Sequence, residues 1–164
     1  MLVKNLMTIY PICLSSSTNI RHAAEIFSLT EVSDIMVVDE EQNFIGVLSE
    51  GDLLRALMPD FEEILGAGGT LYHAFELFIQ KGSLLAEDSI AHLIIHNPIT
   101  VKPTDEVAKI ATIMIQKNIR RLPVLEDNKL IGTISRSDVC RAIIFNARRG
   151  GKQIVEDGPL PASL

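Results

Sequence analysis

The chain has 164 residues, of which 47% are hydrophobic and 22% are charged. This composition is typical of a globular protein and excludes a disordered or fibrous chain, and the length excludes a large multidomain enzyme. The formal net charge of -6 argues against nonspecific nucleic-acid binding, because duplex-binding proteins concentrate Lys and Arg against the phosphates. The apolar runs are far shorter than the ~20 residues of a membrane span, and the first 20 residues lack an export-signal pattern. A cytoplasmic protein with no membrane span is therefore predicted.

Two cysteines, Cys13 and Cys140, are far apart in the sequence, and each lies inside an apolar pattern. This arrangement gives no support for a disulfide framework, and a metal site would need other ligands. Both cysteines are predicted to be small buried hydrophobic residues.

An internal repeat organises the chain. Aligning Pro11 with Pro98 keeps the apolar positions in phase, and the segment FIGVLSEGDLLRAL from Phe44 then aligns with LIGTISRSDVCRAI from Leu130 after a one-residue gap. Ile, Gly, Ser, Asp, Arg and Ala are identical in register within these two segments. The repeat predicts one unit at 4–58 and a second at 90–147. An inserted helical linker at 59–89 and a flexible C-terminal tail at 150–164 complete the predicted organisation.

The elements of the first unit follow from its periodicity. A β-branched run at 12–14 predicts a strand, and the polar cluster at 17–19 has the chemistry of a helix start. Apolar residues at helical spacing predict a helix after this cluster, and two strands follow at 35–38 and 44–48. A second helix comes next and is broken by Pro59.

The inserted segment is predicted to contain a glycine joint at 66–69 and a short amphipathic helix closed by Gly82. Its apolar stripe has no evident partner within the repeats, which predicts an interaction element. The stripe either covers an exposed edge of its own module or packs on a second subunit, and we favour the second. The stripe consists of Leu71, Ala74, Phe75, Phe78 and Ile79.

The second unit repeats the same order of elements. A strand is expected at 99–101, a helix start at 104–106, and two further strands at 122–125 and 130–134 before the last helix. Each unit is therefore β-α-β-β-α, and the predicted fold class is α/β with two repeated units.

The repeated segment contains the motif Gly-x-x-Ser-x-x-Asp twice, with Ser49 and Asp52 in the first unit and Ser135 and Asp138 in the second. One interpretation is structural: a serine at a strand end and an acid three residues later form a helix-capping box. The other is functional, because a carboxylate beside free helix amides can accept hydrogen bonds from both hydroxyls of a ribose. Spacing alone does not decide between them.

The tandem unit resembles a pair of cystathionine β-synthase (CBS) domains, also called a Bateman module. The resemblance is carried by the doubled motif, by Asn-Pro-Ile-Thr-Val at 97–101 and by Arg-Arg-Leu-Pro-Val at 120–124. It implies two units packed with pseudo-twofold symmetry, with clefts between them that bind AMP, ADP, ATP or S-adenosylmethionine. It also implies a regulatory ligand sensor that forms a homodimer, signals to a partner protein and catalyses no reaction.

The same resemblance implies which residues contact the ligand. Ribose contacts fall on Ser135 and Asp138, and on Ser49 and Asp52 in the first copy. The basic pair Arg120 and Arg121 corresponds to the family's phosphate contacts. The adenine cleft would involve Thr100, Val101, Leu122 and Pro123, matched in the first copy by Cys13, Leu14, Ile35 and Met36.

The first copy departs from the family pattern, because Met36 replaces the proline and Ser33-Asp34 replaces the basic pair. Asp34 would repel an incoming phosphate. The two potential sites are therefore expected to be unequal.

Other signals are weaker. His92 and His96 have the spacing of two metal ligands on a helix, but no glutamate lies between them, and no metal site is predicted. Gly-x-Ser-x-Gly and Cys-x-x-Cys are absent from the sequence, so no catalytic residue is predicted. Two alternatives stay open: a ligand-free dimerisation or docking scaffold, favoured by the imperfect first copy, and an unrecognised nucleotide-processing enzyme.

Overall fold

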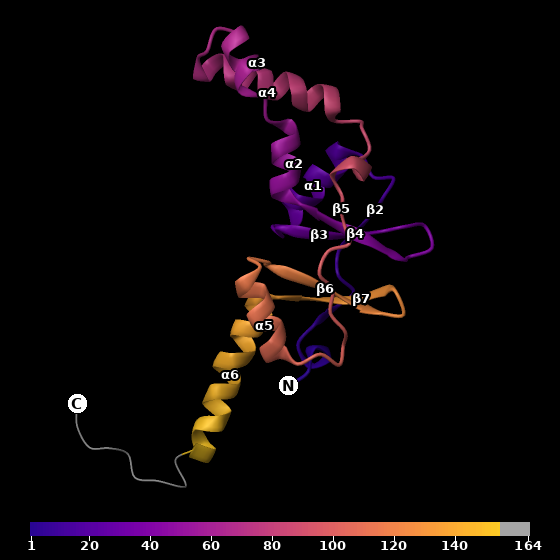
Figure 1. The fold of residues 1–164 in the computed structure, drawn as a ribbon, viewed down its shortest axis with the longest axis vertical. Coiled ribbons are helices and arrows are strands. Elements are labelled where there is room, and N and C mark those ends of the chain that lie inside the picture. Colours follow the sequence, from indigo (N-terminus) through magenta and orange to yellow (C-terminus); the bar gives the residue numbers. More distant parts are fainter. Residues whose placement is uncertain (155–164) are drawn as a thin grey trace, which may run out of the picture. The chain divides into compact units, whose positions relative to one another are not determined.

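The computed structural model describes the backbone of residues 1–154 and the side chains of residues 1–145. The chain divides into two compact units (Figure 1). The first-repeat unit comprises Pro11–Ile99 with Asp127–Leu130, and the second-repeat unit comprises Met1–Tyr10, Thr100–Glu126 and the chain from Ile131 onward. The predicted α/β class with two repeated units is confirmed.

The first-repeat unit contains a four-stranded sheet in the order β2-β3-β4-β5. The parallel pair is β2 with β3, and the other two pairs are antiparallel. The strands are β2 (Cys13–Ser15), β3 (Asp34–Val38), β4 (Phe44–Ser49) and β5 (Ile95–His96).

Two helices, α1 (Ile20–Thr30) and α2 (Glu50–Leu57), pack on one face of this sheet. The Asn19 side chain caps α1 by accepting a hydrogen bond from the His22 amide at 2.9 Å, as the polar cluster at 17–19 predicts. The core combines alternate strand positions with one stripe of each helix. Its buried members are Leu14, Ile20, Ala23, Phe27, Ile35, Val37, Leu48, Leu53, Ile90 and Ile94.

The inserted segment contains α3 (Phe61–Gly66), α4 (Leu71–Leu85) and the 3-10 helix η2 (Ile90–Leu93). Helix α2 ends at Leu57, two residues before Pro59. The prediction that Gly82 closes the amphipathic helix is wrong, because α4 continues through it to Leu85. Gly82 has no positive φ, the conformation that a C-terminal glycine cap requires, whereas Gly68 and Gly69 have it in the predicted joint.

The second-repeat unit contains a three-stranded sheet in the order β1-β7-β6. Its elements are η1 (Val3–Asn5), β1 (Thr8–Ile9), α5 (Val107–Gln116), β6 (Arg121–Glu126), β7 (Lys129–Ser135) and α6 (Arg136–Ile154). The strand expected at 99–101 is reduced to one residue, Val101, which bridges Val124 in parallel. Helix α6 runs past the predicted tail boundary at Gly150, and the rest of that tail lies outside the described residues.

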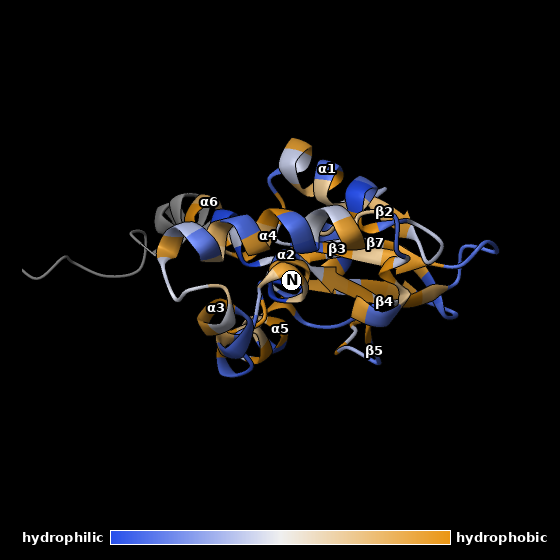
Figure 2. Ribbon diagram, turned by 90° about the horizontal axis from the view of Figure 1, so that it is seen from above, coloured by the Kyte–Doolittle hydropathy of each residue, from blue (hydrophilic) through white to orange (hydrophobic). Residues whose placement is uncertain are grey.

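The short strands are exchanged between the repeats. β1 lies at the start of the first repeat but pairs with β7 of the second, whereas β5 lies at the start of the second repeat but pairs with β4 of the first. Each compact unit therefore contains most of one repeat together with a short strand contributed by the other. The central strands are predominantly apolar, whereas the helices carry both apolar and polar residues (Figure 2).

Both cysteines are exposed, contrary to the prediction of burial. Strand alternation explains Cys13, because its neighbour Leu14 enters the core and Cys13 therefore faces the opposite side of β2. Among the described side chains of α6, Val139 and Ala142 are buried, and Cys140 lies off that stripe. Among the described residues, no helix is long and apolar enough to span a membrane.

Candidate ligand-binding site

The first Gly-x-x-Ser-x-x-Asp motif lies where β4 ends and α2 begins. Ser49 is the N-cap residue: its Oγ accepts a hydrogen bond from the Asp52 amide at 3.0 Å and donates one to Asp52 Oδ2 at 2.5 Å. The guanidinium of Arg55 donates to Asp52 Oδ1. These contacts hold the pKa of the Asp52 carboxyl below its usual value, with the hydrogen bond from Ser49 the largest cause and Arg55 a further one.

The second motif has the same geometry where β7 ends and α6 begins. Ser135 Oγ accepts from the Asp138 amide at 3.2 Å, and Asp138 Oδ2 accepts from the Ser135 amide at 2.9 Å and from its Oγ at 2.6 Å. This reciprocal arrangement is a capping box. Arg141 donates to Asp138 Oδ1 at 3.3 Å, as Arg55 does to Asp52 in the first copy. This arginine is identical in the two aligned repeats, but no ligand-binding role was predicted for it.

The capping contacts do not use all the hydrogen-bond acceptor positions of the Asp52 and Asp138 carboxylates. A carboxylate has about four acceptor positions, and each aspartate here uses only part of them on its serine and arginine. The Asp52 side chain is 26% exposed and the Asp138 side chain 13% exposed. Helix capping and acceptance of a ligand hydroxyl are therefore compatible at the same carboxylate.

The corner of the second-repeat sheet beside Ser135 is basic. The Arg136 amide donates to the Arg120 carbonyl at 3.0 Å, which joins the start of β6 to the end of β7. Arg121 Nη1 donates to Oγ1 of the buried Thr133 at 3.1 Å. The fold therefore brings the predicted basic pair to the same corner as the Ser135 motif.

The equivalent corner of the first-repeat sheet is acidic. Asp34 lies directly opposite Ser49 in the β3–β4 pairing, and the Glu50 amide donates to the Ser33 carbonyl at 3.1 Å. The Asp34 carboxylate accepts from Ser33 Oγ at 2.6 Å. The first corner thus has Ser33 and Asp34 where the second has Arg120 and Arg121, whereas the motif aspartate is common to both.

The residues expected to contact adenine alternate between the core-facing side of their strands and the opposite side. Leu14 and Ile35 belong to the first core, and Val101 and Leu122 to the second, so these four side chains are held inside their units. Cys13 lies opposite the buried Met36 in the β2–β3 register.

In the second copy, Thr100 is exposed, and the Val101 amide donates to the carbonyl of buried Pro123 at 3.0 Å. Any ligand contact by the four core residues of the two copies would have to be made by their backbone.

Arg136 has a structural role that its sequence context did not predict. Its guanidinium donates to the carbonyls of Ile119 and Met114, both at 2.8 Å, and to Asn118 Oδ1 at 3.0 Å. It therefore ties the end of α5 to the start of α6 and fixes the position of the second motif. Its counterpart in the first repeat is Glu50, so the repeat alignment gave no signal for this role.

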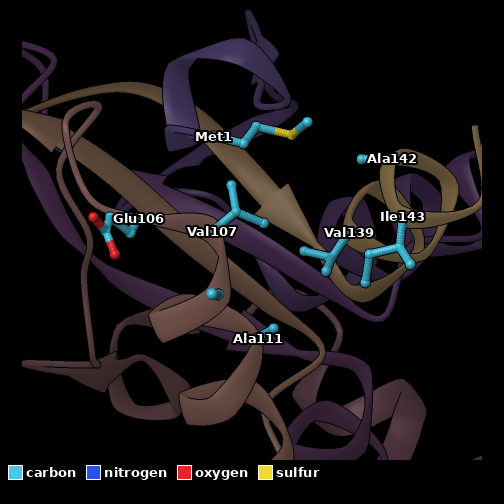
Figure 3. A pocket seen from close by; sticks show the side chains of 8 residues that line it. Met1, Glu106, Val107, Ala111, Val139, Ala142 and Ile143 are labelled. Carbon is cyan, nitrogen blue, oxygen red and sulfur yellow. The ribbon is translucent and has the colours of Figure 1, made fainter. Parts of the chain in front are cut away.

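A separate apolar hollow of about 410 Å³ lies in the second-repeat unit (Figure 3). Its lining comes from the first residue, the start of α5 and the face of α6 that carries Val139 and Ile143. Glu106 is the acidic residue in the lining of this hollow. No residue predicted to contact a ligand lines this hollow, so it is distinct from the motif corner.

The two histidines with ligand spacing do not share a helix. His92 lies in η2 and His96 in β5, so the metal-ligand geometry considered for them does not form. Within the described part of the chain, no group of three or more His, Cys, Asp or Glu side chains could hold a metal ion.

Replacing Ser49 with alanine is expected to destabilise the protein by about 1 kcal/mol at pH 7, as for other N-cap losses. Because the pKa of Asp52 is lowered in the folded state, the carboxylate's share of this stability is present above its unfolded pKa. That share is lost as the pH falls through the folded value. Urea unfolding at pH 7 and at pH 3 should therefore show a smaller deficit at pH 3. Ser137→Ala, at an exposed position of α6, is the control, and an equal deficit for Ser49→Ala at both pH values would contradict this account.

The comparisons with known proteins agree with this architecture. Residues 3–59 and 89–145 each match the family model of the CBS domain. The chain is 24% identical to the uncharacterized protein MJ1426 of Methanocaldococcus jannaschii, over 88% of this chain and 92% of that protein. It is 27% identical to CBSX1, a chloroplastic CBS domain-containing protein of Arabidopsis thaliana, over 83% of this chain and 60% of that protein. The solved structure of CBSX2 in complex with AMP has a TM-score of 0.69 and 25% identity, covering 90% of this chain and 98% of that one.

Proposed function

The chain belongs to the CBS-domain family, and we propose that it binds an adenosine-containing ligand and reports the presence of that ligand to a partner protein. The ligand class is AMP, ADP, ATP or S-adenosylmethionine. The observation that carries the proposal is the motif corner of the second repeat, where Ser135 and Asp138 lie beside Arg120 and Arg121. The similarity to CBSX2, whose structure contains AMP, supports the same ligand class.

Each part of the corner has a chemical role in this proposal. Asp138 accepts hydrogen bonds from the ribose hydroxyls, while Ser135 and Arg141 hold its carboxylate in place. Arg120 and Arg121 bind phosphate oxygens through charge-assisted hydrogen bonds. Thr100 and the backbone around Val101 and Pro123 contact the adenine.

The first copy contributes Ser49 and Asp52 as a second ribose-binding pair, with Cys13, Ile35 and Met36 near the base. Its corner is a poor site for phosphate, because Asp34 repels an anion where the second copy has Arg121. A neutral or cationic adenosine derivative is the better ligand there.

In this role the protein is a cytoplasmic regulatory homodimer that performs no catalysis. Exposed apolar side chains on α5 and α6 support self-association, because such side chains are costly on the surface of a monomer. They include Ile115, Ile143, Ile144 and Phe145. The regulated partner would respond differently to the ligand-bound and the ligand-free protein.

Thermal unfolding with added nucleotide tests this function. A ligand at 100 times its dissociation constant adds about 2.7 kcal/mol to the native state, so AMP, ADP or ATP should raise the melting temperature of the wild-type protein. Asp138→Ala is expected to abolish the shift. Asp138→Asn keeps the size of the side chain but removes its charge, so it should retain the fold and lose ribose affinity. An unchanged nucleotide shift in either folded variant would contradict the proposed role of Asp138.

Two alternative functions, a docking scaffold and an enzyme, can be tested with the same purified protein. The acidic first corner favours a ligand-free docking scaffold, which predicts no shift of the melting temperature with any adenosine compound. A nucleotide-processing enzyme would convert ATP to products on prolonged incubation, which product analysis would detect. Mass spectrometry of small molecules that copurify with the folded protein would identify a tightly bound ligand directly.

A further inference from the structure

The surface of α4 divides into three sectors, since successive residues of an α-helix are about 100° apart. One sector packs against α2 and α3 and holds the partly buried Ala74, Leu77, Lys81 and Leu85. A polar sector holds Glu76, Gln80 and Ser83. Between them lies an apolar sector, which we call the α4 stripe: Leu71, Tyr72, Phe75, Phe78, Ile79 and Gly82.

The α4 stripe is strongly exposed, and apolar residues are visible along α4 in Figure 2. Leu71, Tyr72, Phe75 and Ile79 have exposed fractions between 56% and 91%. Phe61 and Leu65 of the adjoining α3 are also exposed. Together these six side chains expose on the order of 800 Å², which exceeds the largest apolar patch of a typical monomer and matches one side of a standard protein interface.

Local contacts hold the stripe in a fixed orientation. Lys81 Nζ donates to the Met58 carbonyl at 2.9 Å and lies 3.7 Å from the Glu63 carboxylate, which ties α4 to the end of α2 and to α3. Thr70 caps α4 by accepting from the His73 amide. The apolar surface is therefore already formed in one copy and needs no ordering step before it binds.

The position of Gly82 indicates what packs against the α4 stripe. A glycine inside a helix weakens it, yet a Cβ at Gly82 would meet no atom within 4 Å, so nothing within the chain requires the missing side chain. Gly82 lies at one end of the stripe, and the bulky Leu71 lies at the other. When two copies of α4 pair antiparallel so that Leu71 of each falls on Gly82 of the other, Phe75 of each falls on Phe78 of the other. The stripe is thus complementary in shape to itself.

We propose that the α4 stripe pairs antiparallel with the α4 stripe of a second copy of this chain. The two helices are related by a twofold axis near the middle of α4, which makes the contact isologous and closed. Gly82 lets the two backbones approach closely at both ends of the contact. This interface does not involve the ligand-binding residues, so its variants should lose self-association and still show the nucleotide-induced rise in melting temperature.

Gly82→Leu is the direct test. In a single copy the new side chain enters open space and replaces a helix-weakening residue, so the variant should fold with an unchanged or higher melting temperature. In the antiparallel pair it meets Leu71 of the other copy, so self-association should weaken at least tenfold. Ser83→Leu adds the same side chain one position away, in the polar sector, and should associate as the wild type does. Sedimentation equilibrium over a concentration series measures both.

Disulfide trapping tests the direction of pairing. With Cys13 and Cys140 changed to serine, a Leu71→Cys chain mixed with a Gly82→Cys chain should form a disulfide between the two chains under oxidation. Leu71→Cys alone should not crosslink, because its two copies would lie about 16 Å apart along the antiparallel helices. Efficient crosslinking of Leu71→Cys to itself would overturn the antiparallel geometry. A wild-type monomer, or a Gly82→Leu protein of unchanged association, would overturn the interface itself.

Discussion

Gly46→Ala is expected to destabilise the first-repeat unit by about 3 kcal/mol, which is large for the addition of one methyl group. Gly46 lies in β4 opposite β5, and a Cβ built there would fall on the Ile95 carbonyl oxygen, closer than real Cβ atoms approach. It would also lie 2.7 Å from Ile94 Cγ2. Because the nearest atom belongs to the backbone, β5 must move away and its pairing with β4 is lost.

Urea unfolding of Gly46→Ala measures this effect, and a second glycine of the same motif provides the control. A Cβ at Gly51 would make only ordinary contacts, 3.6 Å from Arg55 Nη1 and 3.9 Å from Ser49 Oγ. Gly51→Ala should therefore leave stability unchanged or raise it, since alanine favours the helix α2. Equal effects of the two substitutions would show that the close approach of β5 does not explain the glycine of the motif.

The same geometry recurs in the second repeat, where a Cβ at Gly132 would lie 2.8 Å from the Thr8 carbonyl oxygen of β1. The close approach of a short neighbouring strand thus explains why each Gly-x-x-Ser-x-x-Asp motif begins with glycine. Helix capping explains the serine and the aspartate. Binding of a ligand hydroxyl would be a further role of the aspartate, which the fold does not require.

The central elements could be predicted from the sequence because their periodicity is strong. The apolar runs in β3 and β6 and the helical stripes of α1 and α5 span enough residues for the period to be recognised. β1 and β5 have two residues each, which is too few for any period. Their exchange between repeats depends on long-range pairing and leaves no local signal.

Local signals also failed where the tertiary structure decides the outcome. A glycine such as Gly82 is typical of a helix end, but α4 extends beyond it to Leu85, which packs against the first core. His92 and His96 have helical spacing, but the chain changes from η2 to β5 between them. A spacing rule holds only when one element contains both residues.

The candidate site shows a similar division. The repeat predicted the Ser135 and Asp138 pair, and the fold joins it to the basic pair through the hydrogen bond between Arg136 and Arg120. The contact of Arg121 with Thr133 spans two strands, so no motif could reveal it. Sequence similarity identified the residues, whereas their mutual support is visible only in three dimensions.

Changing Arg120 and Arg121 together to alanine is expected to weaken ATP binding more than a hundredfold and adenosine binding by less than threefold. Hydrogen bonds to charged groups contribute about 1.5–3 kcal/mol each, so two of them to phosphate account for about 3 kcal/mol or more. Adenosine has no phosphate and keeps its contacts with Asp138. Isothermal titration calorimetry of both ligands measures the difference, and the wild-type protein should show one tight ATP site or two of distinct affinity, because Asp34 replaces an arginine in the first copy.

Arg21→Ala is the matched control, since Arg21 is an exposed arginine paired with Glu87 at 2.8 Å and lies outside both motif corners. It should change the affinity for neither ligand. Equal losses of ATP and adenosine in the double variant would assign the basic pair to the fold, where Arg121 contacts Thr133 and Arg120 is joined to the start of α6. Arg121→Lys separates these roles further: lysine keeps the charge but not the planar fork, so ATP affinity should fall by an intermediate amount if the guanidinium binds phosphate through two hydrogen bonds.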